Sequence, residues 1–208
     1  MRHDRHNWQA CLVATFTIAV CSLADTKVAA QFGGGFGGGS PTRDYDEAIA
    51  FSSDGAIVGG GGLDKLRFWD ARTGKLLRTV ALPKPWVHSV AFAPQSSMLY
   101  AACGDGQIYT CDADSGELKL AIAIDAASIK EIAFSPDGKF LACTVEEHAD
   151  ADLKFETFRL WDVSRQTFLR PLFREGDTYL LGLKYSPDGK TLAVGVNVGR
   201  PRHGAIRV

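Results

Sequence analysis

Hydrophobic and polar residues alternate in short runs along residues 44–208, and clusters of turn-forming residues separate these runs. Between residues 88 and 124 the runs read HSVAFA, MLYAAC, QIYTCD and ELKLAIAI, with Gly, Pro, Asp and Ser in the gaps. Period-two alternation in segments rich in β-branched and aromatic residues is typical of β-strands, and no window keeps the apolar spacing of a helix. The pattern predicts an all-β protein built from units of four short antiparallel strands.

The strand pattern repeats along the chain. Four stretches end in an aromatic residue followed by a turn: AIAFSSDG at 48–55, SVAFAPQS at 89–96, EIAFSPDG at 131–138 and GLKYSPDG at 182–189. A second series follows downstream of the first three: LRFWDARTG at 66–74, IYTCDADSG at 108–116 and FRLWDVSRQ at 158–166. Because the two series keep the same spacing, they indicate a single supersecondary unit that is repeated.

The repeated units resemble WD40 repeats, the modules that form the four-stranded blades of β-propellers. The resemblance covers residues 44–208 and rests on Ser-Pro-Asp-Gly at 135–138 and 186–189 and on the Trp-Asp pairs at 69–70 and 161–162. It implies blades at approximately 44–82, 83–125, 126–173 and 174–208, with the last blade truncated.

The resemblance also assigns structural roles to particular side chains. Cys111 takes the tryptophan place in the second unit, and no unit carries the Gly-His dipeptide that the family tends to place before its first strand. Large indole side chains suit the packing between blades. The residues expected to be structural are Trp69, Asp70, Asp112, Trp161 and Asp162, together with Asp64 and Asp105 in tight turns.

The end of the chain aligns with the middle of an earlier repeat. Ala205 to Val208 matches Lys65 to Phe68, which precedes Trp69. We therefore expect about three and a half blades and a ring that this chain does not close, since propellers usually have four to eight blades. The missing blades would come from a longer chain or from a second subunit.

The first thirty residues differ from the repeats. Arg2 and Arg5 precede an uncharged apolar run at 10–24, and small residues follow at 28–30. This order predicts a signal peptide over 1–30 that is cleaved after Ala30, because the run is shorter than the ~20 residues that span a bilayer. Periplasmic or secreted localisation is therefore expected.

Two further features belong to this region. Lipid attachment at Cys21 is a weaker alternative to simple cleavage, because Val20 is bulky for the position before such a cysteine. Residues 31–43 are rich in glycine and predict a flexible linker.

Three cysteines remain after the predicted cleavage: Cys103, Cys111 and Cys143. Counting outward from a turn at Asp105-Gly106 places Cys103 opposite Ile108 and Cys111 on the other face of the sheet, which argues against a disulfide. Buried free thiols are the expectation.

Composition and motifs exclude several kinds of chemistry. The formal net charge of -1 argues against a broad surface for nucleic acid. The chain has no His-Glu-x-x-His, Gly-x-Ser-x-Gly, Cys-x-x-Cys or phosphate-loop motif, and the glycine-rich stretch 59–65 is interpreted as a hairpin turn. No catalytic, cofactor-binding or metal site is predicted.

Two longer segments link the second and third strands of neighbouring units. Residues 146–157 are acidic and residues 197–204 are basic, so together they suggest a charged surface for a partner. The alternatives are two solvated loops whose charges pair at about 0–1 kcal/mol, or a hard-metal site in the acidic segment. The candidate partner-binding residues are Glu146, Glu147, Asp150, Asp152, Arg200, Arg202 and His203.

The sequence therefore favours an exported WD40-repeat protein that acts as a non-catalytic scaffold for protein partners. The alternative is the N-terminal part of a propeller enzyme, an oxidoreductase or hydrolase, with its site mostly in other blades. Trp86, His88 and Lys130 stand at or near the starts of first strands, where a central channel begins, and packing is the favoured role for His88.

Overall fold

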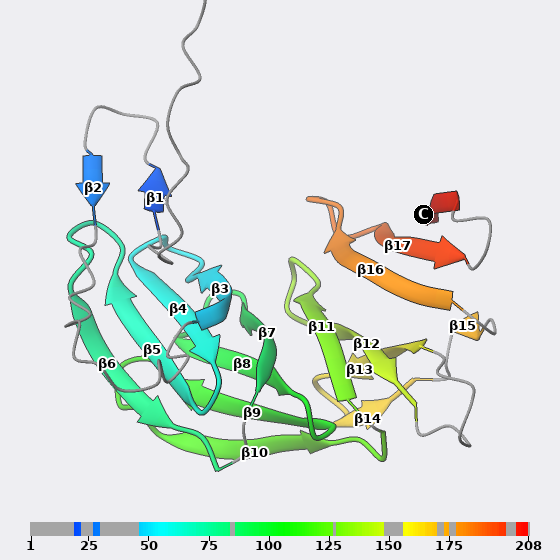
Figure 1. The fold of residues 1–208 in the computed structure, drawn as a ribbon, viewed down its shortest axis with the longest axis horizontal. Helices are drawn as coiled ribbons and strands as arrows, with labels where there is room; N and C mark the ends of the chain where they lie inside the picture. Colours follow the sequence, from blue (N-terminus) through cyan, green and yellow to red (C-terminus); the bar gives the residue numbers. More distant parts are fainter. Residues whose placement is uncertain are drawn as a thin grey trace, which may run out of the picture.

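The computed structural model describes residues 19–21, 27–29, 46–83, 86–126, 128–147, 156–169, 173–174, 178–198 and 203–207. These residues are all-β, as predicted, with no helix and hence none long and apolar enough to cross a membrane. Four sheets formed by consecutive antiparallel strands follow one another along an arc whose ends do not meet (Figure 1). We call them blades 1 to 4.

The strands of each blade keep their order along the chain. Blade 1 holds β3 (Asp46–Phe51), β4 (Ile57–Gly62), β5 (Lys65–Asp70) and β6 (Leu76–Ala81). Blade 2 holds β7 (Val87–Phe92), β8 (Met98–Cys103), β9 (Gln107–Asp112) and β10 (Leu118–Ala123). Blade 3 holds β11 (Ser128–Phe134), β12 (Phe140–Glu146), β13 (Glu156–Asp162), β14 (Thr167–Phe168) and β15 (Phe173–Arg174), and blade 4 holds β16 (Thr178–Tyr185), β17 (Leu192–Val198) and β18 (His203–Arg207).

The N-terminal region is described only in part. A two-stranded sheet joins β1 (Ala19–Cys21) to β2 (Lys27–Ala29). The rest of the predicted signal peptide and the whole of the predicted linker at 31–43 lie outside the described residues, so both remain predictions.

Serine and aspartate side chains form the turn between the first and second strands. In blade 3 the Ser135 hydroxyl donates to Oδ1 of Asp137 at 2.7 Å and accepts the N–H of Phe140 at 3.0 Å. Gly138 completes the turn with a φ of 72°, a conformation that glycine adopts without strain. Ser52 and Ser186 make the equivalent contacts in blades 1 and 4.

In blades 1 to 3 an aspartate ends the third strand and shapes the turn into the fourth strand. Oδ1 of Asp112 accepts the N–H of Ser115 at 2.7 Å and that of Asp114 at 3.0 Å, while the Ser97 hydroxyl donates to Oδ2 at 2.7 Å. The bonds from Ser115 and Ser97 lower the pKa of Asp112 to about 2. Asp70 and Asp162 make the equivalent turn contacts in blades 1 and 3.

Two aspartates lie in the turns between second and third strands. Oδ1 of Asp105 accepts the N–H of Gln107 at 3.2 Å. Asp64 lies 3.7 Å from Nζ of Lys65, and its backbone oxygen accepts the N–H of Leu82 at 2.8 Å. Both turns are thus held partly by the aspartates themselves.

The turn after β8 differs from the sequence-based expectation. It contains three residues, 104–106, because Gly106 adopts a φ of 77° and its N–H donates to the Cys103 oxygen at 3.3 Å. Ile108 therefore pairs with Ala102 rather than with Cys103. A shift of one residue moves every side chain of a strand to the other face.

This register corrects the predicted placement of the cysteines. Cys111 pairs with Leu99, so it lies on the same face of blade 2 as Cys103 and not on the opposite face. The separation of Leu99 and Cys103 along β8 keeps the two thiols about 13 Å apart. Cys103, Cys111 and Cys143 are buried free thiols, and burial raises the pKa of Cys103 and Cys143 to about 12.

The interpretation of residues 59–65 as a turn is wrong for its first half. Gly59 and Gly61 lie within β4, and only residues 63–64 turn. A Cβ added at Gly61 would lie 2.5 Å from Cγ1 of Val87, and one at Gly59 would lie 3.0 Å from Leu99. The glycines let blade 2 approach the backbone of blade 1.

Three apolar layers hold successive blades together. The layer between blades 1 and 2 includes Leu66, Phe68, Val90 and Leu99. The layer between blades 2 and 3 includes Ile108, Ile132, Leu141 and Cys143, and the layer between blades 3 and 4 includes Ala142, Phe158, Leu180 and Leu183. Trp161 packs on the second layer and meets Phe168 edge-on at 4.7 Å between ring centroids.

Candidate partner-binding site

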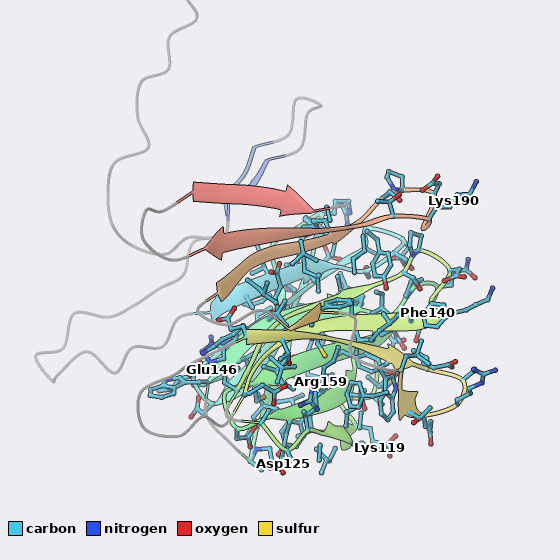
Figure 2. The ribbon with its side chains drawn as sticks, turned by 90° about the vertical axis from the view of Figure 1, so that its right-hand side faces the viewer. Lys119, Asp125, Phe140, Glu146, Arg159 and Lys190 are labelled. Carbon is cyan, nitrogen blue, oxygen red and sulfur yellow. The ribbon has the colours of Figure 1, made fainter. Side chains whose placement is uncertain are left out.

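The predicted acidic segment begins at the rim of blade 3 opposite to the Ser-Asp turns. Figure 2 shows Glu146 on one side of the molecule and Phe140 and Lys190 on the other. Glu146 ends β12 and pairs across the strands with Glu156, the first residue of β13. Like charges directly opposite one another destabilise a sheet, so this end of the blade needs a compensating cation.

Lys130 supplies that cation. Nζ of Lys130 lies 2.8 Å from Oε2 of Glu146, and the two side chains are 34% and 16% exposed. The pairing of β11 with β12 shifts between Ile129 and Glu131, which leaves Lys130 at a bulge. Bulges redirect a side chain without ending the strand, and here the redirected side chain meets the acidic strand end.

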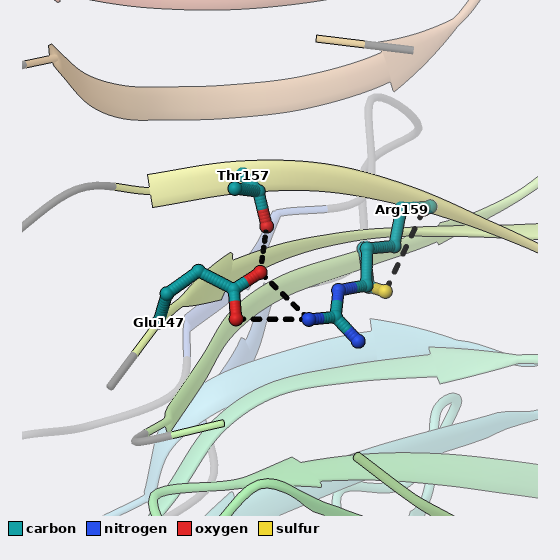
Figure 3. A network of polar contacts seen from close by, with 4 residues as sticks. Glu147, Thr157 and Arg159 are labelled. Atoms are coloured by element: carbon teal, nitrogen blue, oxygen red, sulfur yellow. Dashed lines mark hydrogen bonds and ion pairs between the residues drawn. The ribbon is translucent and has the colours of Figure 1, made fainter. Parts of the chain in front are cut away.

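A second ion pair fixes the residue after β12. One terminal nitrogen of Arg159 lies 2.7 and 2.8 Å from the two carboxylate oxygens of Glu147, and the Thr157 hydroxyl donates to the same carboxylate (Figure 3). The Glu147 and Arg159 side chains are 15% and 24% exposed. A charge-assisted contact shielded in this way is stronger than a solvated ion pair.

Arg159 is itself held by its surroundings. The thiol of Cys143 donates to the Arg159 backbone oxygen at 3.6 Å, and the guanidinium lies 6.0 Å from the centroid of the Phe168 ring. Ion pairs therefore anchor the start of the 147–155 link to β13 and β11.

Glu156 connects blade 3 to blade 4. Its side chain is buried, and Oε2 accepts the N–H of Leu180 at 2.5 Å. Burial raises the pKa of Glu156 above its usual value, the Leu180 N–H and Lys130 oppose this rise, and Glu146 adds to it.

A shallow cavity of about 350 Å³ lies between the first strands of the blades. Its lining includes His88 and Lys130, two of the three residues that the sequence placed at the channel, whereas the third, Trp86, is not among the lining residues and is 60% exposed. Ser89, Glu131 and Lys184 add further polar groups. Among the described residues, no group of three or more His, Cys, Asp or Glu side chains is arranged to hold a metal ion.

The structure places only part of the predicted charged surface. Glu146 and Glu147 make ion pairs within the chain, as described above. Asp150, Asp152, Arg200 and Arg202 lie outside the described residues, and of His203 only the backbone in β18 is described. Their role in binding a partner remains a prediction.

Arg159 and Glu156 belong to this site but were not among the residues expected from the sequence. Both lie in the repeated third strand, where a repeat pattern draws attention to Trp161 and Asp162 instead. The signal available was their position: Arg159 stands where blade 2 has Tyr109, and Glu156 stands where blade 2 has Gly106.

The comparisons with known proteins agree with this architecture. Residues 74–112 match the family model described as WD domain, G-beta repeat. The match spans the end of one repeat and the first three strands of the next, which are the strands observed in blades 1 and 2. The chain contains a WD repeat, and its sheets have the arrangement of β-propeller blades.

Two curated relatives of this WD40 protein are similar over much of its length. The small ribosomal subunit protein RACK1y of Oryza sativa subsp. japonica is 25% identical over 180 residues, which are 82% of this chain and 50% of the rice protein. WD repeat-containing protein 3 of Mus musculus is 27% identical over 151 residues, 70% of this chain and 16% of the mouse protein. The chain thus spans half or less of the relatives that it matches.

Solved structures share the fold. A Kuenenia stuttgartiensis hydrazine synthase chain has a TM-score of 0.63 at 20% identity, covering 74% of this chain and 44% of its own. The computationally designed Ika4 protein has a TM-score of 0.55 at 20% identity, covering 79% and 91%. The β-propeller domain of Cps50 (Swd1) from Myceliophteria thermophila has a TM-score of 0.56 at 15% identity, covering 73% and 49%.

Proposed function

We propose that this WD40 protein is an exported, non-catalytic scaffold that binds protein partners on the rim where the second strands of blades 3 and 4 end. WD40 repeats generally serve as protein-interaction modules, which supports the class of function. The rim itself is suggested by the long 147–155 link that follows β12, beside the shorter 199–202 link that follows β17. Loops on a rigid frame are common places for recognition.

The anchored start of the first link carries this proposal. Glu147 is bound to Arg159 and Thr157, and Glu146 to Lys130, so the charges nearest the frame are neutralised within the chain. The acidic residues further along the link, Asp150 and Asp152, would then be the ones that meet a partner. The likeness to hydrazine synthase shows the fold alone and adds no catalytic argument.

A paired comparison tests the binding rim. Full-length protein would be immobilised and exposed to the extracytoplasmic fraction of its host, and captured proteins would be purified and titrated calorimetrically. Asp150→Lys combined with Asp152→Lys should weaken binding by about tenfold or more, as loss of complementary charge does at interfaces. Asp114→Lys is the control, because Asp114 is exposed in a turn at the other rim. If the native protein, the double variant and the Asp114 variant bind equally well, the rim is not the surface that binds the partner.

Export has a separate test. N-terminal sequencing of protein recovered outside the cytoplasm should begin at Gln31, the residue after the predicted cleavage site. Recovery of the intact Met1 end in the cytoplasmic fraction only would contradict export while leaving the scaffold proposal standing.

A further inference from the structure

Trp86 lies at the surface in the link between blades 1 and 2. Its side chain is 60% exposed. Leu63, in the turn between β4 and β5, is 41% exposed, and its backbone oxygen accepts the N–H of Trp86. The two exposed apolar residues are therefore neighbours. Both blades that flank Trp86 are described, so its exposure does not depend on what packs against the outer faces of blades 1 and 4.

The backbone of Trp86 is fixed on both sides. Besides the bond to Leu63, the Trp86 oxygen accepts the N–H of Gly104 at 2.9 Å, in the turn between β8 and β9. A Cβ added at Gly104 would lie 3.6 Å from Cβ of Trp86. The base of the side chain is thus held between two tight turns while most of the ring is in water. An apolar group held in place in this way loses little conformational freedom when it binds a partner.

The conformation of Trp86 is strained. Its φ is 68°, in the left-handed region, where a bulky side chain is rare and glycine is free of strain. Packing within the chain does not repay this strain, because most of the side chain is exposed. Strained residues of this kind cluster at sites that hold ligands, so the compensating contact is expected outside the chain.

Negative charge flanks Trp86 on both sides. Asp64, in the turn between β4 and β5, has a side chain that is 61% exposed and lies 3.7 Å from Nζ of Lys65. Asp105 lies in the turn between β8 and β9, and its Oδ2 has no hydrogen-bond partner among the described residues. A cationic side chain would be attracted both by these carboxylates and by the face of the indole ring.

We propose that Trp86 and Leu63 anchor a segment of a partner protein in which an apolar side chain stands beside Lys or Arg. Leu63 and Gly104 follow the second strands β4 and β8, so they lie on the same rim as the link that follows β12. The proposal rests on the scaffold function proposed above and names the chemistry of the partner. Exposed tryptophans that become buried commonly supply much of the binding energy of an interface.

Peptides selected on the full chain from a random phage-displayed library test this chemistry. The enriched peptides should carry an aromatic or large aliphatic residue next to Lys or Arg. Synthetic copies would then be titrated calorimetrically. Trp86→Gly and Asp64→Lys should each weaken their binding by about tenfold or more. Leu120→Ala is the control and should leave it unchanged, since Leu120 is 53% exposed on the outermost strand of blade 2.

Melting temperature separates a binding role of Trp86 from a structural one. Glycine adopts a φ of 68° without strain, so Trp86→Gly should melt no lower than the native protein although it binds the peptides more weakly. A variant that melts lower would show that the indole supports the fold, which would overturn the proposal.

The peptides also distinguish this proposal from the proposed function. Binding that needs Asp150 and Asp152 but not Trp86 would overturn the Trp86 proposal and leave the rim scaffold standing. No enrichment, enrichment of acidic peptides, or equal affinity for the native protein and Trp86→Gly would each overturn it as well. Binding that is lost in Trp86→Gly but kept in Leu120→Ala would support it.

Discussion

Ion pairs of this protein differ in how exposed they are to water, and this exposure decides how much each pair contributes to folding stability. Glu147 and Arg159 are 15% and 24% exposed, whereas the similar pair of Lys119 and Glu117 is 63% and 61% exposed. A shielded pair leaves an uncompensated charge when one partner is removed, but a solvated pair does not.

Glu147→Gln should therefore lower the free energy of unfolding by about 1–3 kcal/mol, measured by urea denaturation at pH 7. Lys119→Ala is the matched control and should change it by less than about 0.5 kcal/mol. If the two variants lose the same stability, the Glu147 and Arg159 contact is no more than a surface ion pair.

Glu156 makes the stability of the protein depend on pH in a direction opposite to that of the turn aspartates. The pKa of Glu156 is raised in the folded protein, so folding favours its protonated form. The stability that results is present below the pKa of Glu156 in the unfolded chain, about 4.3, and is lost as pH rises through the pKa in the folded protein. Glu156→Gln keeps an oxygen that accepts the Leu180 N–H and removes the charge. The variant should melt higher than the native protein at pH 7.5.

The same comparison at low pH is the control. Near pH 4 native Glu156 is largely protonated, so the difference in melting temperature should shrink toward zero. A variant that melts lower at pH 7.5, or a difference that does not change with pH, would show that the buried charge is not the cause.

Contacts between individual side chains were the part of the structure that the sequence predicted least well. Asp112 and Asp162 could be singled out because they recur with a fixed period, and their contacts follow from the local turn. Arg159 and Glu156 depend on partners that lie more than ten residues away, Glu147 and Leu180, and no periodic signal marks such contacts.

At the scale of single strands, β4 shows why small residues are needed between blades. Gly61 faces Val87 so closely that a methyl group has no room without movement of the neighbouring strand. Overpacking of this kind typically costs 1–3 kcal/mol.

Gly61→Ala should lower stability by about 1–3 kcal/mol in chemical denaturation. The change should cost less in a Val87→Ala background, because that substitution removes the side-chain atoms in the way, and a double-mutant cycle measures the difference. Additive effects of the two substitutions would mean that the glycine is required for another reason.

The order of the first four strands in a blade could be predicted from the sequence, because alternation and turn residues are local, but β1, β2 and β15 were not predicted. The pairing register of β8 with β9 could not, since it depends on whether the turn has two or three residues, and Asp105-Gly106 fits either count. The same limit applies to 59–62, where composition indicates a turn but the contact with blade 2 requires a strand of small residues.

At the scale of the whole molecule, stability depends on the layers between blades rather than on a single central core. Blades 2 and 3 have another blade packed on each face. Among the described residues no further blade packs on the outer face of blade 4 or on the outer face of blade 1, where Ile49 and Phe51 are 54% and 52% exposed although Trp69 is 4% exposed. In stacked repeats, each unit gains most of its stability from its neighbours.

Native-state hydrogen exchange followed by mass spectrometry tests this stacking most directly. At low protein concentration the slowest amides should lie in β8, β9 and β12, and those of β3, β4, β16 and β17 should exchange faster, since their blades are covered on one side only. Equal protection of all four blades at low concentration, or the weakest protection in blades 2 and 3, would contradict the account.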